Sequence, residues 1–391
     1  MQKGAFLERA LVTSQWPSNP ELVSSPDALS ADPSLAAQYV ARLVKSGPGN
    51  LISNVASKPM LCRYQDLRLP VTVEDGTLGH SYVISPHSNY VLYARDEIDI
   101  LDLRFGRTLA IGTLSVLDAV LRLLDVNKTV HLDNWILSTS LHGDWHGQGL
   151  PEIRDLLTRQ FPDHLPVIRS LDQWSCPELM HAAKDDGWLL MPARQIWVTN
   201  DLRRDWKKRN NTQNDRRALK KSDFVVRQPE TLAVEEARRI AELYRALYVG
   251  RYSAINPIFT PEFVQNAAET GLLQFKLVCA PDGEIVAACG MRQAGGIGTV
   301  PFLGYDLDRP QSDGLYRIAC YLASEWAMEL GLRFNGSAGA AQFKTMRGAR
   351  GQIEYMAVYV GHLSAKRRMG IQLLSAALNS VMVPMLKKQA W

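Results

Sequence analysis

The chain has 391 residues, of which 46% are hydrophobic, and its 44 Lys and Arg against 40 Asp and Glu give a net charge of +4. This length and hydrophobic content predict a globular protein of two or three domains with a sizeable core. So small a net charge does not by itself indicate a polyanionic partner, although it is compatible with one.

The beginning of the chain, "MQKGAFLERALVTSQW", has no continuous apolar region followed by a small-residue cleavage site. No run of about 18 uninterrupted apolar residues occurs either. We therefore expect a cytoplasmic protein that does not enter a membrane. The cysteines are five in number, scattered and without a CxxC pair, which predicts buried free thiols rather than disulfides or metal ligands.

Residues 1–60 are expected to form an N-terminal segment that wraps around the rest, with a short helix at 34–45. Strands and helices then alternate, which indicates an α/β layer. The strands of this first half are predicted at 67–76, 81–86, 134–141, 165–171 and 188–199, and its helices at 113–124, 149–161 and 176–187.

Near residue 200 a charged helix, 203–221, leads into a second alternation. Strands are predicted at 223–228, 272–281, 284–293, 297–306, 333–337 and 354–360, and helices at 234–252, 260–271 and 313–330, with a further helix at the C-terminus. We place a domain boundary near residue 200. No Gly/Ser-rich linker occurs there, so the two halves are expected to pack closely.

The helix predicted at 313–330 begins beside residues suited to an anion. Ser312 or Asp313 can cap its first turn, and Gly331 can end it. The N–H groups and the positive dipole end of such a helix, preceded by Arg309, attract a phosphate or a carboxylate. A helix end that binds only water is the alternative.

The order of segments in the second half resembles the C-terminal half of the GNAT acyltransferase fold. "GLYR", "NGSAGAAQFKTMRGA" and "EYMAVY" follow one another as in the branch of FemABX-type acyltransferases. "RRDWKKRNNTQNDRRALKKSDFVVR" is similar to the basic helix and strand that open the catalytic unit of such proteins. In the first half, "YVISPHSNYVLYARDEIDIL" looks like their diverged N-terminal unit.

This resemblance covers about residues 60–365 and rests on the order of many weak motifs. It implies an α/β fold with two tandem GNAT-like domains, each a mixed central sheet flanked by helices. The extension 1–60 would precede a diverged domain at 61–200 and a catalytic domain at 201–391.

The resemblance leaves the donor open. Acetyl-CoA-binding GNATs carry a pyrophosphate loop of the form R/Q-x-x-G-x-G/A, whereas "RPQSDGLYR" keeps an Arg, a Gln and one Gly. FemABX-like members, which use aminoacyl-tRNA, also lack the full loop. We therefore expect acyl-CoA or aminoacyl-tRNA as a co-substrate, with no tightly bound cofactor. The candidate donor-binding residues of this loop are Arg309, Gln311, Ser312 and Gly314.

A basic stretch bears on the same choice. Residues 201–230 contain ten Lys and Arg against five acidic residues, with Trp206 among them. Such a stretch suits a phosphate backbone, and Lys207, Lys208 and Arg209 are candidates for holding tRNA. A solvated helix with ion pairs is the alternative.

The resemblance implies that two neighbouring parallel strands diverge, here those at 297–305 and 333–337, so that backbone N–H groups face the acyl oxygen. The small residues 336–340 would let the substrates approach. Lys344 and Arg347, three positions apart, could bind a phosphate or carboxylate, or form a salt-bridged surface. Ser337 is a catalytic candidate, although a tight turn fits it better.

Glu354 is the candidate general base, because strand alternation places it opposite Tyr355 and towards the donor opening. A structural glutamate is the alternative. Tyr252, Asn256, Tyr305 and Asn335 are candidates for contacts to the acceptor. For Tyr252 and Asn256, which precede Pro257, a plain loop anchor is equally consistent.

A zinc site is a weaker hypothesis. "LHGDWHG" places His142 and His146 four residues apart with Asp144 between them, a spacing that faces one way on a helix. The flanking glycines oppose a helix and no third ligand follows, so we expect a loop and no metal.

Together these features predict amide-forming acyl or aminoacyl transfer to the amine of a small-molecule or peptidyl acceptor, by direct attack in a ternary complex. A catalytically inactive RNA-binding or scaffold protein is the alternative. tRNA is a possible partner, and the sequence leaves the oligomeric state open.

Overall fold

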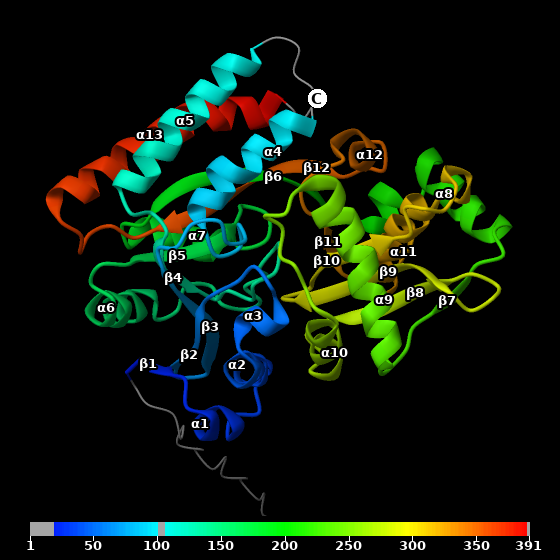
Figure 1. Ribbon diagram of the computed structural model, residues 1–391, viewed down its shortest axis with the longest axis horizontal. Helices are drawn as coiled ribbons and strands as arrows, with labels where there is room; N and C mark the ends of the chain where they lie inside the picture. The colour runs from blue at the N-terminus through cyan, green and yellow to red at the C-terminus, as the bar shows by residue number, and fades with distance from the viewer. Residues whose placement is uncertain (1–18, 101–105, 389–391) are drawn as a thin grey trace, which may run out of the picture.

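A single mixed sheet runs through the part of the chain that the computed structural model describes, residues 19–100 and 106–388 (Figure 1). Its twelve strands lie in the order β1-β2-β3-β4-β5-β12-β6-β11-β10-β9-β8-β7. Helices pack around this sheet, and the predicted α/β class is confirmed.

The first half of the chain contributes six strands and most of the helices around them. Its strands are β1 (Glu21–Val23), β2 (Lys58–Tyr64), β3 (Leu67–Asp75), β4 (Lys128–Leu132), β5 (Leu165–Leu171) and β6 (Leu189–Thr199). Its helices are α1 (Pro26–Ser30), α2 (Leu35–Ser46), α3 (Pro48–Leu51), a π-helix (Ser88–Leu92), α4 (Tyr93–Ile100), α5 (Arg107–Leu123), α6 (Leu150–Gln160) and α7 (Pro177–Asp185).

The second half begins with two short helical segments and then builds the other side of the sheet. Its strands are β7 (Val225–Arg227), β8 (Gln274–Cys279), β9 (Ile285–Ala294), β10 (Ile297–Tyr305), β11 (Arg333–Asn335) and β12 (Arg350–Val358). Its helices are a π-helix (Leu202–Trp206), α8 (Asn210–Lys221), α9 (Val234–Tyr244), a further π-helix (Arg245–Tyr252), α10 (Pro261–Glu269), a 3-10 helix (Gln311–Asp313), α11 (Leu315–Glu329), α12 (Ala341–Thr345) and α13 (Ala365–Lys388).

Two predicted strands, 81–86 and 134–141, are wrong, because both segments are buried but irregular. Ile136 has a φ of 51°, in the left-handed region that no extended strand contains. The Asn134 amide nitrogen donates to the Val83 carbonyl at 3.2 Å. A side chain thus satisfies a backbone group that a strand partner would otherwise bind.

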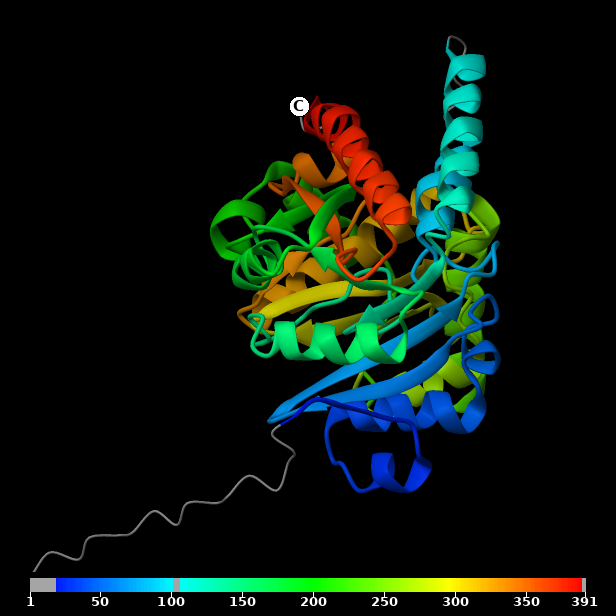
Figure 2. The same ribbon diagram turned by 90° about the vertical axis from the view of Figure 1, so that its left-hand side faces the viewer.

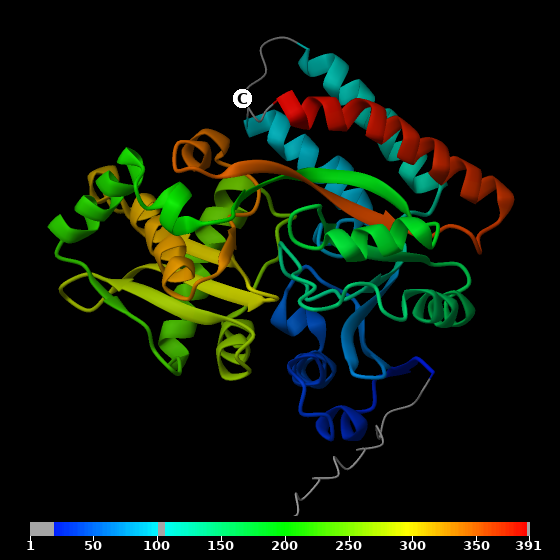
Figure 3. The ribbon, with the colours of Figure 1, turned by 180° about the vertical axis from the view of Figure 1, so that it is seen from behind.

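The last strand and helix of the chain return to the first half. β12 lies between β5 and β6 and pairs antiparallel with both, and α13 packs across β6 and β12 (Figure 3). The chain does pass from one half to the other at residue 200, where β6 ends. β12 follows the second half in the sequence but pairs with β5 and β6 of the first half.

The N-terminal segment ties the two halves together. α2, which lies within the helix predicted at 34–45 apart from its last residue, begins after the N-cap Ser34 and packs on β2 and β3. Further along, Ser53 N donates to the Ile258 carbonyl at 2.9 Å, and Thr260 N donates to the Leu51 carbonyl at 3.0 Å. Residues 20–60 therefore form the expected wrap, whereas residues 1–18 lie outside the described part.

An irregularity in β10 has a clear cause in the sequence. Pro301 lies in the middle of β10, and its ring nitrogen cannot donate a ladder hydrogen bond. The register of β10 with β9 shifts between Thr299 and Phe302. Because a proline inside a sheet is accommodated at such a bulge, Pro301 accounts for the shift.

Gly304 lets α9 approach β10, and we expect Gly304→Ala to lower the free energy of unfolding by about 1–3 kcal/mol. A Cβ atom at Gly304 would lie 2.6 Å from backbone atoms of Leu243 and Tyr244, which cannot rotate away. Urea unfolding measures the effect. Gly112→Ala is the matched control, because a Cβ at Gly112 in α5 meets nothing within 4 Å. Equal loss in both variants would contradict the prediction.

Candidate functional site

The predicted divergence of two parallel strands is present between β10 and β11. They pair only from Ile297 to Thr299 with Arg333 to Asn335. β10 continues to Tyr305, whereas the chain leaves β11 at Asn335 and enters the turn at 336–340. In the described structure, the edge of β10 beyond Thr299 therefore has no strand beside it on the side of β11, and we call this place the opening.

Lys344 of α12 extends its ammonium group to the turn that borders the opening. Its Nζ donates to the carbonyls of Ala338 at 2.7 Å and Ser337 at 3.3 Å. Burial lowers the pKa of Lys344 from its ordinary 10.5 to about 8. The nearby charge of Arg194 lowers it too, while Cys320 acts in the opposite direction. With this pKa about a tenth of Lys344 is the neutral amine at pH 7, and the neutral share grows to half near pH 8.

Aromatic rings and one thiol lie around Lys344. The ring of Tyr316 lies 4.9 Å from that of Phe343 and 5.8 Å from that of Tyr305, and a side-chain hydrogen bond joins Tyr316 to Cys320. Burial raises the pKa of Cys320 to about 11. The Cys320 thiol is therefore protonated at neutral pH, and it is no candidate for a nucleophile.

Arg347, which was predicted to bind an anion together with Lys344, is held by a buried carboxylate. Its Nε and a terminal nitrogen lie 2.6 and 3.0 Å from the oxygens of Asp215, which is 1% exposed. Arg317 reaches the same carboxylate at 2.8 Å. This network joins the turn that follows α12 to α8 and α11, so Arg347 fits the salt-bridged alternative.

The loop before α11 differs in detail from the prediction. Arg309 forms an ion pair with Asp313 at 2.9 Å, and Gln311 begins a short 3-10 helix. The predicted cap by Ser312 or Asp313 is wrong, because the N-cap is Gly314, at a φ of 65°, and no side chain caps the helix. The first turn of α11 therefore keeps the polarity that attracts an anion.

Asn335 and Ser337 shape the turn that borders the opening. Ser337 N donates to Asn335 Oδ1 at 2.8 Å, and Trp197 N donates to the Ser337 carbonyl at 3.0 Å. Ser337 has a φ of 58°, and Asn335 is buried. Both residues therefore have a structural task in the turn, as the tight-turn alternative expects for Ser337.

Of the residues predicted to contact an acceptor, two belong to the aromatic group. Tyr252 is 43% exposed and its ring lies 6.1 Å from that of Tyr248; besides burial, the nearby Tyr252 raises the pKa of Tyr305. Asn256 is buried, and its amide donates to the carbonyls of Tyr248 and Ser253 at 3.0 and 3.1 Å. Asn256 is thus a loop anchor.

The basic stretch is divided rather than one continuous helix. Lys207, Lys208 and Arg209 lie exposed between the π-helix Leu202–Trp206 and α8. Trp206 is buried, with its ring 5.4 Å from that of Tyr321. The three cations can meet a phosphate, whereas Trp206 cannot stack on a base.

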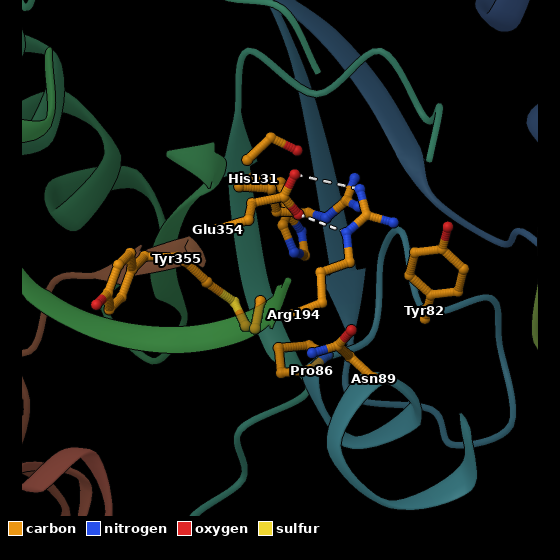
Figure 4. A pocket seen from close by; sticks show the side chains of 11 residues that line it. Tyr82, Pro86, Asn89, His131, Arg194, Glu354 and Tyr355 are labelled. Carbon is orange, nitrogen blue, oxygen red and sulfur yellow. Dashed lines mark hydrogen bonds and ion pairs between the residues drawn. The ribbon is translucent and has the colours of Figure 1, made fainter. Parts of the chain in front are cut away.

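Glu354 lies on β12, and β6 is the one strand between β12 and β11. Its carboxylate accepts hydrogen bonds from Arg194 Nε at 2.8 Å and from a terminal nitrogen at 3.2 Å (Figure 4). Tyr355 points to the other side of the strand, as predicted. This ion pair fits the alternative of a structural glutamate, and the role of Glu354 as general base stays a prediction.

This ion pair lines a pocket of about 340 Å³, open mouth included, at the junction of β5, β6 and β12. Burial lowers the pKa of Arg169 to about 10 and that of His131 to about 3, so His131 is neutral. Sequence reasoning missed Arg169 and Arg194. The only signal was an arginine inside each of two otherwise buried strands, "LPVIRSL" and "LLMPARQIWVT".

The two histidines of the zinc hypothesis do not converge. His142 is buried with its Nδ1 2.7 Å from Asp133 Oδ2, and His146 pairs with Glu178 at the surface at 2.7 Å. Within residues 19–100 and 106–388, no group of three or more His, Cys, Asp or Glu side chains could hold a metal ion. The cysteines are free, and all but Cys320 are buried.

No family model and no curated protein matches the sequence. Among solved structures, L-PGS from Bacillus licheniformis is similar over 58% of this chain and 79% of that chain, at 17% identity and a TM-score of 0.43. FemX is similar over 56% of this chain and 78% of that chain, at 12% identity and a TM-score of 0.43. A tandem GNAT protein from the clavulanic acid biosynthesis pathway is similar over 87% of this chain and 98% of that chain, at 10% identity and a TM-score of 0.38. At these values the fold description rests on this chain's own strand order and register.

Proposed function

We propose that the protein forms amide bonds, by transferring an acyl or aminoacyl group from a CoA thioester or an aminoacyl-tRNA to the amine of a small-molecule or peptidyl acceptor. The observation that carries the proposal is the opening between β10 and β11 with the Lys344 amine at its border. Backbone N–H groups along the free edge of β10 would stabilise the charge that develops on the acyl oxygen. The small residues 336–340 would leave room for the reacting carbon.

Lys344 takes the role of proton acceptor in this proposal. A neutral lysine amine has two N–H donors and one lone pair, so it keeps its hydrogen bonds to Ser337 and Ala338 and still accepts a proton. The acceptor nitrogen attacks the acyl carbon, a C–N bond forms, and its proton passes to Lys344 Nζ. The C–S or C–O bond to the donor then breaks, and the proton neutralises the leaving thiolate or ribose oxygen. A pKa of about 8 suits this exchange near neutral pH.

Two features would hold the phosphates of the donor. The uncapped first turn of α11 lies directly after β10 and the loop with Arg309. Lys207, Lys208 and Arg209 are exposed at the beginning of the second half, where a tRNA backbone could bind. Tyr252 and Tyr305 would contact the acceptor, since both belong to the aromatic group around Lys344.

A donor screen tests the proposal. The purified protein is heated with acetyl-CoA, longer acyl-CoAs or charged total tRNA, and a donor at 100 times its dissociation constant should add about 2.7 kcal/mol of stability. Mass spectrometry of mixtures with candidate amines then detects the amide. Stabilisation by a CoA thioester would identify the donor as acyl-CoA, and stabilisation by charged tRNA that is lost at high salt would identify aminoacyl-tRNA.

The alternative, an inactive RNA-binding protein, has its own signature in the same screen. Charged and uncharged tRNA would then stabilise the protein equally, and no amide would form. Reversing the charge of Lys207, Lys208 and Arg209 would weaken RNA binding under either function, so that variant alone does not separate them. Absence of both donor binding and amide formation would refute the proposed transfer.

A further inference from the structure

The end of the molecule formed by α5 and α13 exposes an unusual amount of apolar surface. Eight of the sixteen large hydrophobic side chains that are exposed in the described residues lie on these two helices. Figure 2 shows both helices rising from the same end of the molecule, with α5 projecting farthest. The exposed apolar side chains are Leu109, Ile111, Val116 and Leu123 of α5 and Met369, Leu373, Val381 and Met385 of α13.

α13 is long and apolar enough, by length and composition, to cross a membrane, and 22% of its most apolar stretch is buried. It is the one such helix in the described part of the chain. Its inner face is fixed to the sheet, because Ile371, Leu374 and Leu378 belong to the core and Asn379 Nδ2 donates to the Leu190 carbonyl at 2.8 Å. α13 therefore lies on the body of the protein with its outer face uncovered.

The exposed side of α13 carries an apolar row. Met369, Leu373, Val381 and Met385 are 57–66% exposed. With Ala377 they recur every four residues, so the row winds gradually around the helix from its outermost side toward its flank. Water would have to cover this row in the free protein. Monomeric proteins rarely leave contiguous apolar surface of this kind without a partner.

The charges of α13 indicate which partner fits. Residues 365–388 contain no acidic residue, and basic residues stand at both ends of the helix: Lys366, Arg367 and Arg368, and Lys387 and Lys388. Arg367 donates to the carbonyls of Leu124 and Asp125, which leaves the other four exposed. An apolar row between two cationic ends matches a bilayer surface, where acyl chains receive the row and anionic headgroups receive the cations.

A second copy of the chain fits less well. If α13 packed against α13 of another molecule, parallel or antiparallel, basic ends would meet basic ends.

An apolar pocket lies where α5 and α13 converge, and it extends the same surface inward, with Leu121 of α5 and Ile371 of α13 in its lining. We propose that the α5 and α13 surface docks on a membrane that contains anionic phospholipid, with α13 lying in the plane of the interface.

Sedimentation with vesicles tests this docking. The full chain is expected to pellet with vesicles of phosphatidylcholine and phosphatidylglycerol in equal amounts, at least about tenfold more than with phosphatidylcholine alone. High salt should release it. Lys387→Glu with Lys388→Glu should weaken binding about tenfold, and Leu373→Gln with Val381→Gln should weaken it further.

The matched control is Val225→Gln with Val234→Gln, which removes two exposed valines, 56% and 62% exposed, from the second half of the chain. This control should bind like the unmodified protein, and all variants should keep its melting temperature, since every changed side chain is exposed. Equal binding by the α13 variants and the control would overturn the proposal. Release of the protein from vesicles only by detergent would also overturn the proposal. A third contradicting outcome is a protein that does not pellet with vesicles and forms a dimer in light scattering, if Leu373→Gln with Val381→Gln abolishes that dimer.

Discussion

Replacing Lys344 with methionine is expected to lower the rate of amide formation by about 10²- to 10⁴-fold, because the acceptor amine loses its proton acceptor. Methionine keeps most of the length of the lysine side chain and removes only its amine. The measurement is kcat under saturating donor and acceptor, once the donor screen has identified a substrate pair. The stabilisation by the donor should remain, since in our proposal Lys344 acts on the acceptor nitrogen.

The dependence of the reaction rate on pH is a second test of Lys344. As a base Lys344 must be neutral, so the rate should rise with pH and level off above about 8. Stability should change as well. Since the pKa of Lys344 is lower in the folded protein, the unfolded chain binds its proton more tightly, and the free energy of unfolding should rise between pH 8 and 10.5. Both slopes should disappear in Lys344→Met.

Lys276→Met is the matched control for this variant. Lys276 is also largely buried, with 12% of its side chain exposed, but it pairs with Glu329 and stacks on Trp326 at the far side of the second half. It should keep full activity. If Lys344→Met were as active as Lys276→Met, Lys344 would be a structural lysine that only caps the turn at 336–340.

The sequence predicted the regular elements of this fold better than its buried irregular ones. α2, α6, α7 and the strands from β5 to β10 follow from hydrophobic periodicity. Residues 81–86 and 134–141 are as apolar as strands, so periodicity could not distinguish them. Their backbone groups are satisfied by side chains such as Asn134, a tertiary effect that no local pattern reveals.

The resemblance implied the divergence of two strands, which the structure has between β10 and β11. Lys344 was predicted as a cation that binds an anion and not as a base. Its burial depends on the turn at 336–340 and on Tyr316, 28 residues earlier in the chain, so its lowered pKa could not be read from local spacing. Likewise, the insertion of β12 between β5 and β6 is a property of topology alone.

Changing Glu354 to glutamine is expected to lower the free energy of unfolding by about 3–5 kcal/mol, because it leaves the cation of Arg194 in the interior without its carboxylate. Only 4% of the Glu354 side chain and 19% of the Arg194 side chain are exposed. Burial alone would lower the pKa of Arg194, but the charge of Glu354 raises it, so Arg194 stays charged in the folded protein. Urea unfolding measures the loss.

A double variant separates the ion pair from catalysis. Arg194→Met with Glu354→Met removes both charges, and it should recover much of the stability that Glu354→Gln loses, because a buried ion pair adds little over apolar residues of similar size. In our proposal the folded fraction of Glu354→Gln keeps its turnover, since Lys344 receives the proton. A Glu354→Gln variant with undiminished stability and abolished turnover would instead make Glu354 the base. The acceptor would then have to bind at the pocket between β5, β6 and β12.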